Sequence, residues 1–537
     1  MATVNKNTND IIMISLYLVR DTHDNGMTLQ EYADGVLVGD QPILGHEEFV
    51  YQFGATDANL QFVIAWAQSN DLIIYEAHHG QSVVKVEGTV GTFNRLFNIV
   101  LQDVTDADRT YMMPNVAPTI PAQLIGIVES VPGFDQSFLA VKHLKIADAE
   151  IANPDTAVTP VQMATAYNIP GSNAFGACIG IFELTYSGSP EGWQQPDVTA
   201  SFNRIGAVAP TIVTINVDSA VVNSTSTAET MLDIYCAGAV AQKAKIAYYI
   251  APNGGTQYII DCINATANDT TNNPSALGIS WGLGDTTAYD SAFQACVAKG
   301  ITVFVSSGDS GADNLSVSAS CTSQYIVSAG GTTITLNSSN QITNEVAWSG
   351  SGGGISTVVS LPSWQTGLKA STKTVSTTGT PTVITKRGIP DISAPADPNS
   401  GYQFYIGGTS SAQGSFVQYG GTSAAAPLLA GIWARLNQQL GKRIPFNMST
   451  WYTYSTQQSG TVPTPNLFND ITSGDNRDGY TTGYATTVGW DPVTGVGSPK
   501  VDQIYQYFHT GPTFPKQNYG FRPAAGATYP RRSSGVR

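Results

Sequence analysis

The sequence has few histidines, and their positions exclude one common kind of active site. Six of its 537 residues are histidine, and none lies between residues 147 and 508. A triad of serine, histidine and aspartate needs an imidazole beside the serine to accept its proton. Such a triad cannot be built within this long stretch. A serine nucleophile there would need a carboxylate or a lysine as its base.

Charge is also sparse, at 12% of residues, and the formal net charge is −15. This acidic balance argues against a nucleic-acid partner. No apolar run approaches the roughly 20 residues that span a bilayer, which argues against a membrane partner. The run at residues 11–19 has the length of a signal-peptide core, but Asp10 precedes it and no small-residue cleavage site follows. We interpret it as a buried strand.

Cysteine is scarce as well. The five cysteines are scattered, without a CxxC pair or other zinc-finger spacing, so we predict no zinc site. An odd number leaves at least one thiol unpaired, and any pairing among the others stays open.

The length predicts more than one domain, because single cores rarely exceed roughly 300 residues. Residues 1–145 mix strands with amphipathic helices, which indicates an α+β open sheet. Residues 146–160 have neither period and contain two prolines, as expected of an exposed linker. Over residues 161–508 apolar strands alternate with helices, which predicts an α/β domain with a parallel sheet covered on both faces. Residues 509–537 are rich in Pro, Gly and Arg, and we predict a flexible basic tail.

One serine stands in a setting suited to catalysis. The sequence GGTSAAAP places Ser423 at the start of an alanine-rich helix. Backbone N–H groups at a helix N-terminus can stabilise an oxyanion, so Ser423 is a candidate nucleophile. An ordinary N-cap serine would give the same pattern.

Two acids on a predicted helix are candidates for the base. Glu229 and Asp233 are four residues apart, so they share one helix face among apolar neighbours. Two like charges on a partly buried face raise at least one pKa, and the pair would then share a proton. The alternative is two solvated acids near a helix start. Asp309 follows an apolar strand in the sequence SSGDSGA. Held protonated, it could donate a hydrogen bond to an oxyanion, although an Asx-turn would explain it equally.

Together these motifs resemble the sedolisin family of serine-carboxyl peptidases. GGTSAAAP resembles the family's nucleophile motif, ETMLD its catalytic helix and SSGDSGA its oxyanion segment. The resemblance implies a subtilisin-like fold, with Ser423 as nucleophile, Glu229 as general base and acid, and Asp309 as oxyanion donor. Asp233 would orient Glu229. It also implies that residues 1–145 are an inhibitory propeptide, with an activation cut in the linker between Leu144 and Thr159.

The resemblance extends to a calcium loop near the C-terminus. FNDIT and VGWDPVTGVGSP are similar to the family's Ca2+ loop. One structural Ca2+ is implied, bound by the carboxylates of Asp470 and Asp491 and the carbonyls of Ile471, Thr487 and Gly489. Many relatives have glycine where Thr487 stands. A pair of Asx-turns in a glycine-rich loop is the alternative.

The predicted function is an acid-acting, autoprocessing endopeptidase. Its partners would be protein or peptide substrates and its own propeptide, and we expect a monomer. By resemblance, it would work outside the cell or in an acidic compartment. Three alternatives stay open: a tripeptidyl-peptidase of the same family, a non-enzymatic binding or structural protein on the same scaffold, and an esterase, which the lack of a GxSxG motif with a histidine disfavours.

Overall fold

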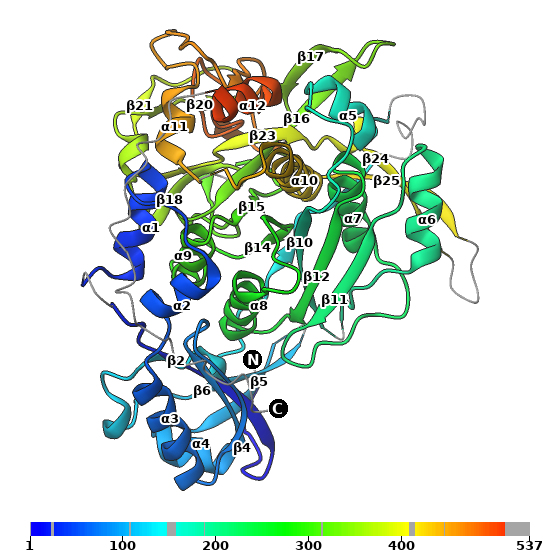
Figure 1. The fold of residues 1–537 in the computed structure, drawn as a ribbon. Coiled ribbons are helices and arrows are strands. Elements are labelled where there is room, and N and C mark those ends of the chain that lie inside the picture. Colours follow the sequence, from blue (N-terminus) through cyan, green and yellow to red (C-terminus); the bar gives the residue numbers. More distant parts are fainter. Residues whose placement is uncertain are drawn as a thin grey trace, which may run out of the picture.

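A largely parallel sheet forms the centre of the molecule (Figure 1). The computed structural model describes residues 2–22, 26–106, 109–147, 157–186, 188–312, 315–407, 414–444 and 446–510. The main sheet has eight strands. In spatial order they are β11 (Thr211–Asn216), β12 (Lys245–Pro252), β10 (Cys178–Thr185), β13 (Ala276–Ile279), β15 (Thr302–Ser306), β16 (Val327–Leu336) and β17 (Ile342–Ala347), with β23 (Ile392–Pro395) also paired to β16. Only β17 runs antiparallel to its neighbour.

Helices cover both faces of this sheet. Helices α7 (Ala228–Val240) and α10 (Thr422–Leu440) pack together on one face, and α8 (Thr256–Asn268) and α9 (Asp290–Ala298) lie on the other. Two glycines in strands of the main sheet allow helices to pack closely against it. A side chain at Gly278 would meet Pro427 of α10, and one at Gly180 would meet Leu277 of the neighbouring strand β13 and Thr266 of α8. The parallel sheet and the helices on both of its faces confirm the predicted α/β fold class.

The N-terminal unit has its own sheet and its own apolar core. Strands β3 (Ile73–His78), β4 (Val83–Thr89), β2 (Ile11–Leu18) and β7 (Val128–Ser130) pair antiparallel in that order. Helices α3 (Asp57–Ser69) and α4 (Val90–Phe97) contribute to this core. A second sheet joins β1 (Ala2–Asn5), β5 (Leu101–Thr105) and β6 (Thr110–Pro114). The apolar run at residues 11–19 is thus a strand, as predicted.

Two helices of this region were not predicted. Helices α1 (Leu29–Val38) and α2 (His46–Phe53) share the core of the central domain, and α1 packs on α9 and on α11 (Met448–Thr453). The remaining helices are α5 (Pro160–Ala166), α6 (Gln195–Arg204) and α12 (Val501–Thr510). Short strands complete the fold, among them β18 (Gly354–Ser360), β22 (Lys386–Ile389), β24 (Tyr402–Ile406), β25 (Ser415–Gly420), β26 (Phe468–Asn469) and β28 (Ser498–Pro499).

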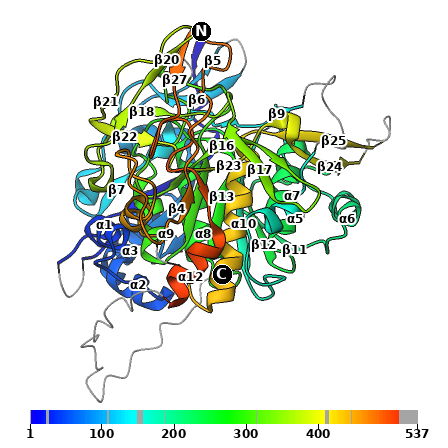
Figure 2. The same ribbon diagram turned by 90° about the horizontal axis from the view of Figure 1, so that it is seen from above.

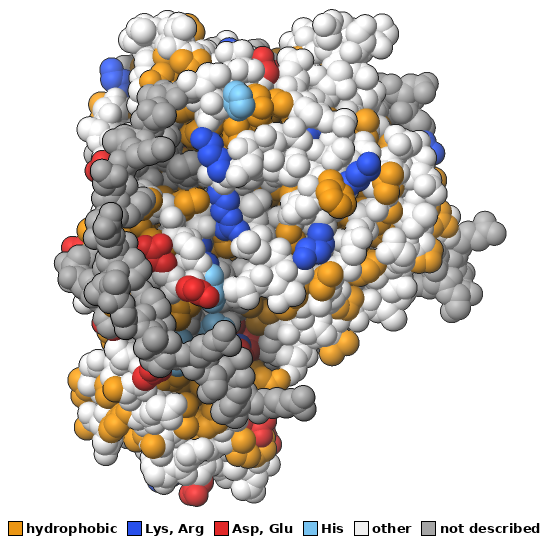
Figure 3. All heavy atoms as spheres, viewed as in Figure 1, with side chains coloured by type: hydrophobic (Ala, Val, Ile, Leu, Met, Phe, Trp, Pro, Cys, Tyr) orange, Lys and Arg blue, Asp and Glu red, His pale blue; other side chains and the backbone are white. Residues whose placement is uncertain are grey.

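Several predictions from composition can be compared with the structure. All five cysteines are buried free thiols. Within the ranges described, no helix has the length and apolarity needed to cross a bilayer. Charged side chains are sparse on the face shown in Figure 3. Most of the predicted linker and tail lies outside the described residues, namely 148–156 and 511–537. The part of the tail that is described, His509 and Thr510, ends α12 rather than being irregular.

A buried lysine ties the N-terminal unit to the central domain. Lys85 of β4 places its ammonium 2.5 Å from Asp218 and 3.3 Å from Asp261, and both aspartate side chains are fully buried. Ser15 and Tyr17 of β2 each donate to Asp261 at 2.8 Å. Breaking a buried pair leaves an uncompensated charge, so this contact holds the two units together strongly.

We predict that Lys85→Met destabilises the whole chain. Loss of the ammonium leaves two buried carboxyl groups without a cation. The free energy of unfolding should therefore fall by about 3–5 kcal/mol. Guanidinium denaturation measures the change. Lys6→Met is the matched control, because Lys6 pairs with the part-exposed Asp103 and should cost under about 1 kcal/mol. Equal effects of the two variants would contradict the prediction.

Candidate active site

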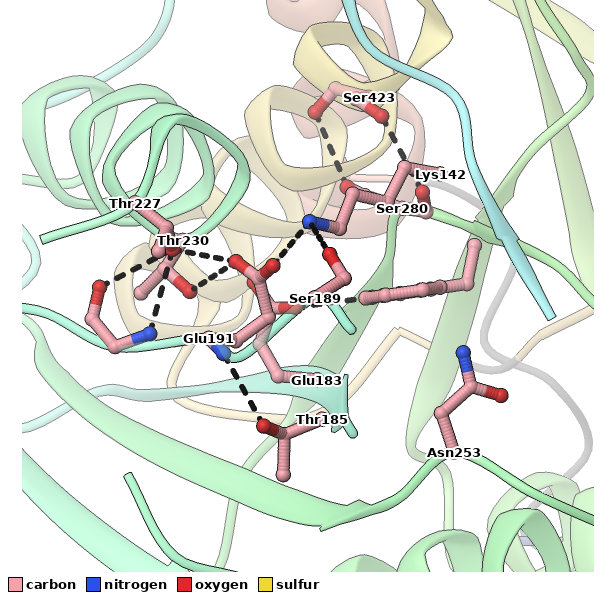
Figure 4. Close-up of polar contacts among 12 residues, drawn as sticks. Lys142, Glu183, Thr185, Ser189, Glu191, Thr227, Thr230, Asn253, Ser280 and Ser423 are labelled. Carbon is pink, nitrogen blue, oxygen red and sulfur yellow. Dashed lines mark hydrogen bonds and ion pairs between the residues drawn. The ribbon is translucent and has the colours of Figure 1, made fainter. Parts of the chain in front are cut away.

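The first turn of α10 carries Ser423, which is completely buried. Gly421 precedes the helix with φ of 102°, in the region that favours glycine. A Cβ on Gly421 would lie 2.2 Å from Asp309 Oδ2 and 2.5 Å from the His143 carbonyl oxygen. The Ser423 backbone N–H donates to that carbonyl at 3.1 Å. Ser423 Oγ donates to the Ser280 carbonyl at 3.3 Å (Figure 4).

Helix α7 carries Glu229 and Asp233, and both side chains are buried. Ser280 links this helix to α10: its hydroxyl lies 2.7 Å from Asp233 Oδ1 and 3.1 Å from the Ser423 carbonyl. Neither Glu229 oxygen has a hydrogen-bond partner among the described residues. Burial, and next the charge of Glu183, raise the pKa of Glu229 and of Asp233 well above their usual values. The cluster therefore holds its protons more tightly than free carboxyl groups do.

Asp309 lies after β15, beside the first turn of α10. Its Oδ1 accepts hydrogen bonds from Thr422 N at 2.7 Å and Thr422 Oγ1 at 2.8 Å. Its Oδ2 is buried without a partner among the described residues. Burial raises the pKa of Asp309 to about 7, although the bonds from Thr422 lower it in part. Below that pH the carboxyl is a hydrogen-bond donor beside the His143 carbonyl.

Sequence reasoning missed two members of this cluster. Glu183, on β10, is fully buried and accepts a hydrogen bond from Trp281 Nε1 at 2.9 Å. Glu191, in the loop after β10, is also fully buried and accepts from Thr230 at 3.3 Å. An acid at the end of an apolar strand, as in the sequence GIFEL, was the available signal for Glu183.

The last residues before the predicted linker pass through this site as an extended strand. Strand β8 (Val141–Lys142) pairs with β14 (Trp281–Gly282), and β9 (Lys145–Ile146) pairs with β25. Figure 2 shows β9 beside β24 and β25. Upstream, the Asn253 side chain forms hydrogen bonds of 3.0 and 2.9 Å with the backbone of Ala140. The bond between His143 and Leu144 thus lies at the nucleophile.

The predicted calcium loop brings its two carboxylates to one turn. Asp470 accepts from Gly489 N at 3.0 and 3.1 Å, and Asp491 accepts from Thr487 N at 3.0 Å. Burial raises the pKa of Asp491 to about 7. In the described part of the chain, no three His, Cys, Asp or Glu side chains converge. An ion here would depend on backbone carbonyls, and this all-oxygen donor set fits calcium.

The chain is similar to known proteins over most of its length. Residues 208–472 match the model of the subtilase family, and residues 7–137 match the activation domain of pro-kumamolisin. The chain is 32% identical to kumamolisin of Bacillus sp. (strain MN-32), over 85% of this chain and 84% of that protein. It is 26% identical to sedolisin of Pseudomonas sp. (strain 101), over 87% of this chain and 82% of that protein. A structure of Pseudomonas sedolisin, in complex with pseudo-iodotyrostatin, matches with a TM-score of 0.53 at 25% identity, covering 66% of this chain and 99% of that one.

We predict that Asp309→Asn flattens the pH dependence of stability. Burial raises the pKa of Asp309 from 3.8 to about 7, so between those values the folded chain holds a proton that the unfolded chain releases. This carboxyl therefore lowers the free energy of unfolding by about 1.4 kcal/mol for each pH unit of rise in that window. Asparagine cannot ionise, so the fall should be shallower by that amount.

Denaturation at four pH values between 4 and 7 tests this slope. Asp40→Asn, at an exposed carboxyl, is the control and should leave the slope unchanged. An unchanged slope in Asp309→Asn would show that Asp309 does not hold its proton.

Proposed function

Because the chain belongs to the sedolisin family of serine-carboxyl peptidases, as a precursor with an activation domain, we propose that it is an acid-acting endopeptidase that first cuts itself after His143. As a family member it is a hydrolase, and the alternative of a non-enzymatic protein on the same scaffold is not retained. The observation that carries the proposal is the segment from Ala140 to Ile146, which lies in the site as a substrate would.

In the proposed reaction, Ser423 Oγ attacks the His143 carbonyl carbon while Glu229, in its ionised form, takes the hydroxyl proton. The oxygen becomes an oxyanion, stabilised by the Ser423 N–H and by protonated Asp309. The C–N bond to Leu144 then breaks, and Glu229 returns the proton to the leaving amine. Water attacks the acyl-enzyme with Glu229 again as base, which frees Ser423.

The described geometry supports these roles. The Ser423 hydroxyl faces the Ser280 carbonyl, and the Glu229 oxygens have no other partner among the described residues. Rotation about one side-chain bond would direct the hydroxyl to Glu229. Asp233 would act through Ser280, which holds α7 against the nucleophile.

One observation favours an endopeptidase over a tripeptidyl-peptidase. A tripeptidyl-peptidase must bind a free N-terminus three residues before the cut, which here would be at Val141. The contacts of the segment instead continue past Val141, because Asn253 holds the backbone of Ala140 and Gly255 N donates to the Phe138 carbonyl at 3.0 Å. An internal stretch of chain therefore fits.

The first cut would fall just before the linker predicted from sequence. It separates residues 1–143 from the rest, and later trimming towards Thr159, where α5 has its N-cap, would then proceed within the linker.

We predict that acidification triggers this cut. The purified precursor should yield a fragment ending at His143 when brought to pH 4, identified by intact mass. The rate should fall as the pH rises through about 7, because Asp309 then loses the proton that it donates. Ser423→Ala should abolish the cut, and Glu229→Gln should slow it by about 100-fold or more. A rate that peaks near pH 8 would contradict the mechanism.

We also propose one structural Ca2+ in the loop that joins Asp470 and Asp491. Asp470, Asp491 and the carbonyls of Ile471, Thr487 and Gly489 would hold it. The ion would neutralise two carboxylates at one turn and fix the loop against β26 and β28. No reaction step depends on it.

We predict that EGTA lowers the thermal midpoint of the chain and that added Ca2+ restores it. A ligand present at 100 times its dissociation constant stabilises by about 2.7 kcal/mol, so the shift should be several degrees. Asp470→Asn should remove the response to EGTA. The control, Asp478→Asn, should keep it. A midpoint insensitive to EGTA in the parent chain would argue against the ion.

A further inference from the structure

A buried glutamate beside the proposed nucleophile binds a lysine of the activation segment. Lys142 of β8 lies one residue before His143. Its side chain forms an ion pair with Glu191. Its ammonium also donates to Ser189 Oγ at 2.7 Å and lies 5.6 Å from the centre of the Trp281 ring. Figure 4 shows the Lys142 ammonium directed at Glu191 and Ser189.

Glu191 is fixed in place and shielded from water. Its side chain is fully buried, whereas that of Lys142 keeps 26% of its exposure. Thr227 and Thr230 donate to its carboxylate, and its backbone N–H donates to Thr185 Oγ1 at 3.2 Å. Thr227 caps α7 and Thr230 lies in its first turn. The helix that positions Glu229 therefore also positions Glu191.

The acidic side chains around the Lys142 ammonium favour a cation at this position. Burial alone would lower the pKa of Lys142, but the charges of Glu191, Glu229 and Glu183 raise it above the usual value. Once the activation segment leaves, Glu191 loses its ammonium partner. A charged carboxyl group in a buried position is costly without a partner, so the position favours another cation.

We infer that Glu191 determines substrate specificity, selecting peptides with lysine or arginine at the second position before the cleaved bond. This inference rests on the proposed function, since the position is defined by the cut after His143. A neutral side chain there would leave the carboxylate desolvated and unpaired, whereas a lysine repeats the contacts of Lys142. Charge-assisted hydrogen bonds of this kind are worth roughly 10- to 100-fold in a rate ratio.

The test compares two peptides on the activated enzyme. One has the sequence of residues 138–147, FLAVKHLKIA, and the other has norleucine in place of the lysine at position 142. The kcat/KM of the parent enzyme should be about 10- to 100-fold higher for the lysine peptide. In Glu191→Gln the ratio should approach one, chiefly because the lysine peptide becomes slower.

A control variant shows whether the change in the ratio is specific to Glu191. Glu345→Gln alters a partly buried glutamate on the edge strand β17 and should leave the ratio unchanged. Equal cleavage of the two peptides by the parent enzyme overturns the inference while the proposed function stands, and this result needs no variant. If the enzyme cuts neither peptide and does not cut its own segment, the proposed function falls, and the inference falls with it.

Discussion

The burial of acidic side chains beneath α7 and α10 is the constraint on which the rest of the structure depends. Glu183, Glu191, Glu229, Asp233 and Asp309 are all shielded from water. Glu183, Glu229 and Asp233 cannot all ionise together, because burial and the charges of neighbouring acids raise the pKa of each. The protein meets this constraint with shared protons, with hydroxyl donors such as Ser280 and with the ammonium of Lys142. The same protons are what the proposed chemistry uses.

The sequence revealed those parts of the site that depend on local spacing. Glu229 and Asp233 were predictable because four residues on a helix give one face, and Ser423 because its motif precedes a helix. The lack of histidine directed attention to carboxylates. Glu183 with Trp281, and Glu191 with Lys142, were not predictable, because those pairs form only when strands far apart in the chain become neighbours.

The fold was predictable to a similar degree, and for the same reason. The alternating strands and helices of the central domain have strong periods. From β10 to β17 the strands of the main sheet lie in chain order, with β11 and β12 on the other side of β10. Helix α1 was missed, although Thr28 and Glu31 form a capping box that the sequence displays. That helix packs on the central domain rather than on its own unit, and no local pattern distinguishes the two. The Ser280 bridge likewise depends on the end of β13 meeting α10.

The segment from Ala140 to Ile146 has a consequence for how the precursor matures. It belongs to the same chain as the nucleophile and is already seated, so the first cut needs no encounter between two molecules. Under the proposed mechanism this step is unimolecular, and its half-life is the same in a dilute as in a concentrated solution. Maturation would then respond to the acidity of the surroundings and not to the amount of protein made, until the first released enzymes begin to cut their neighbours.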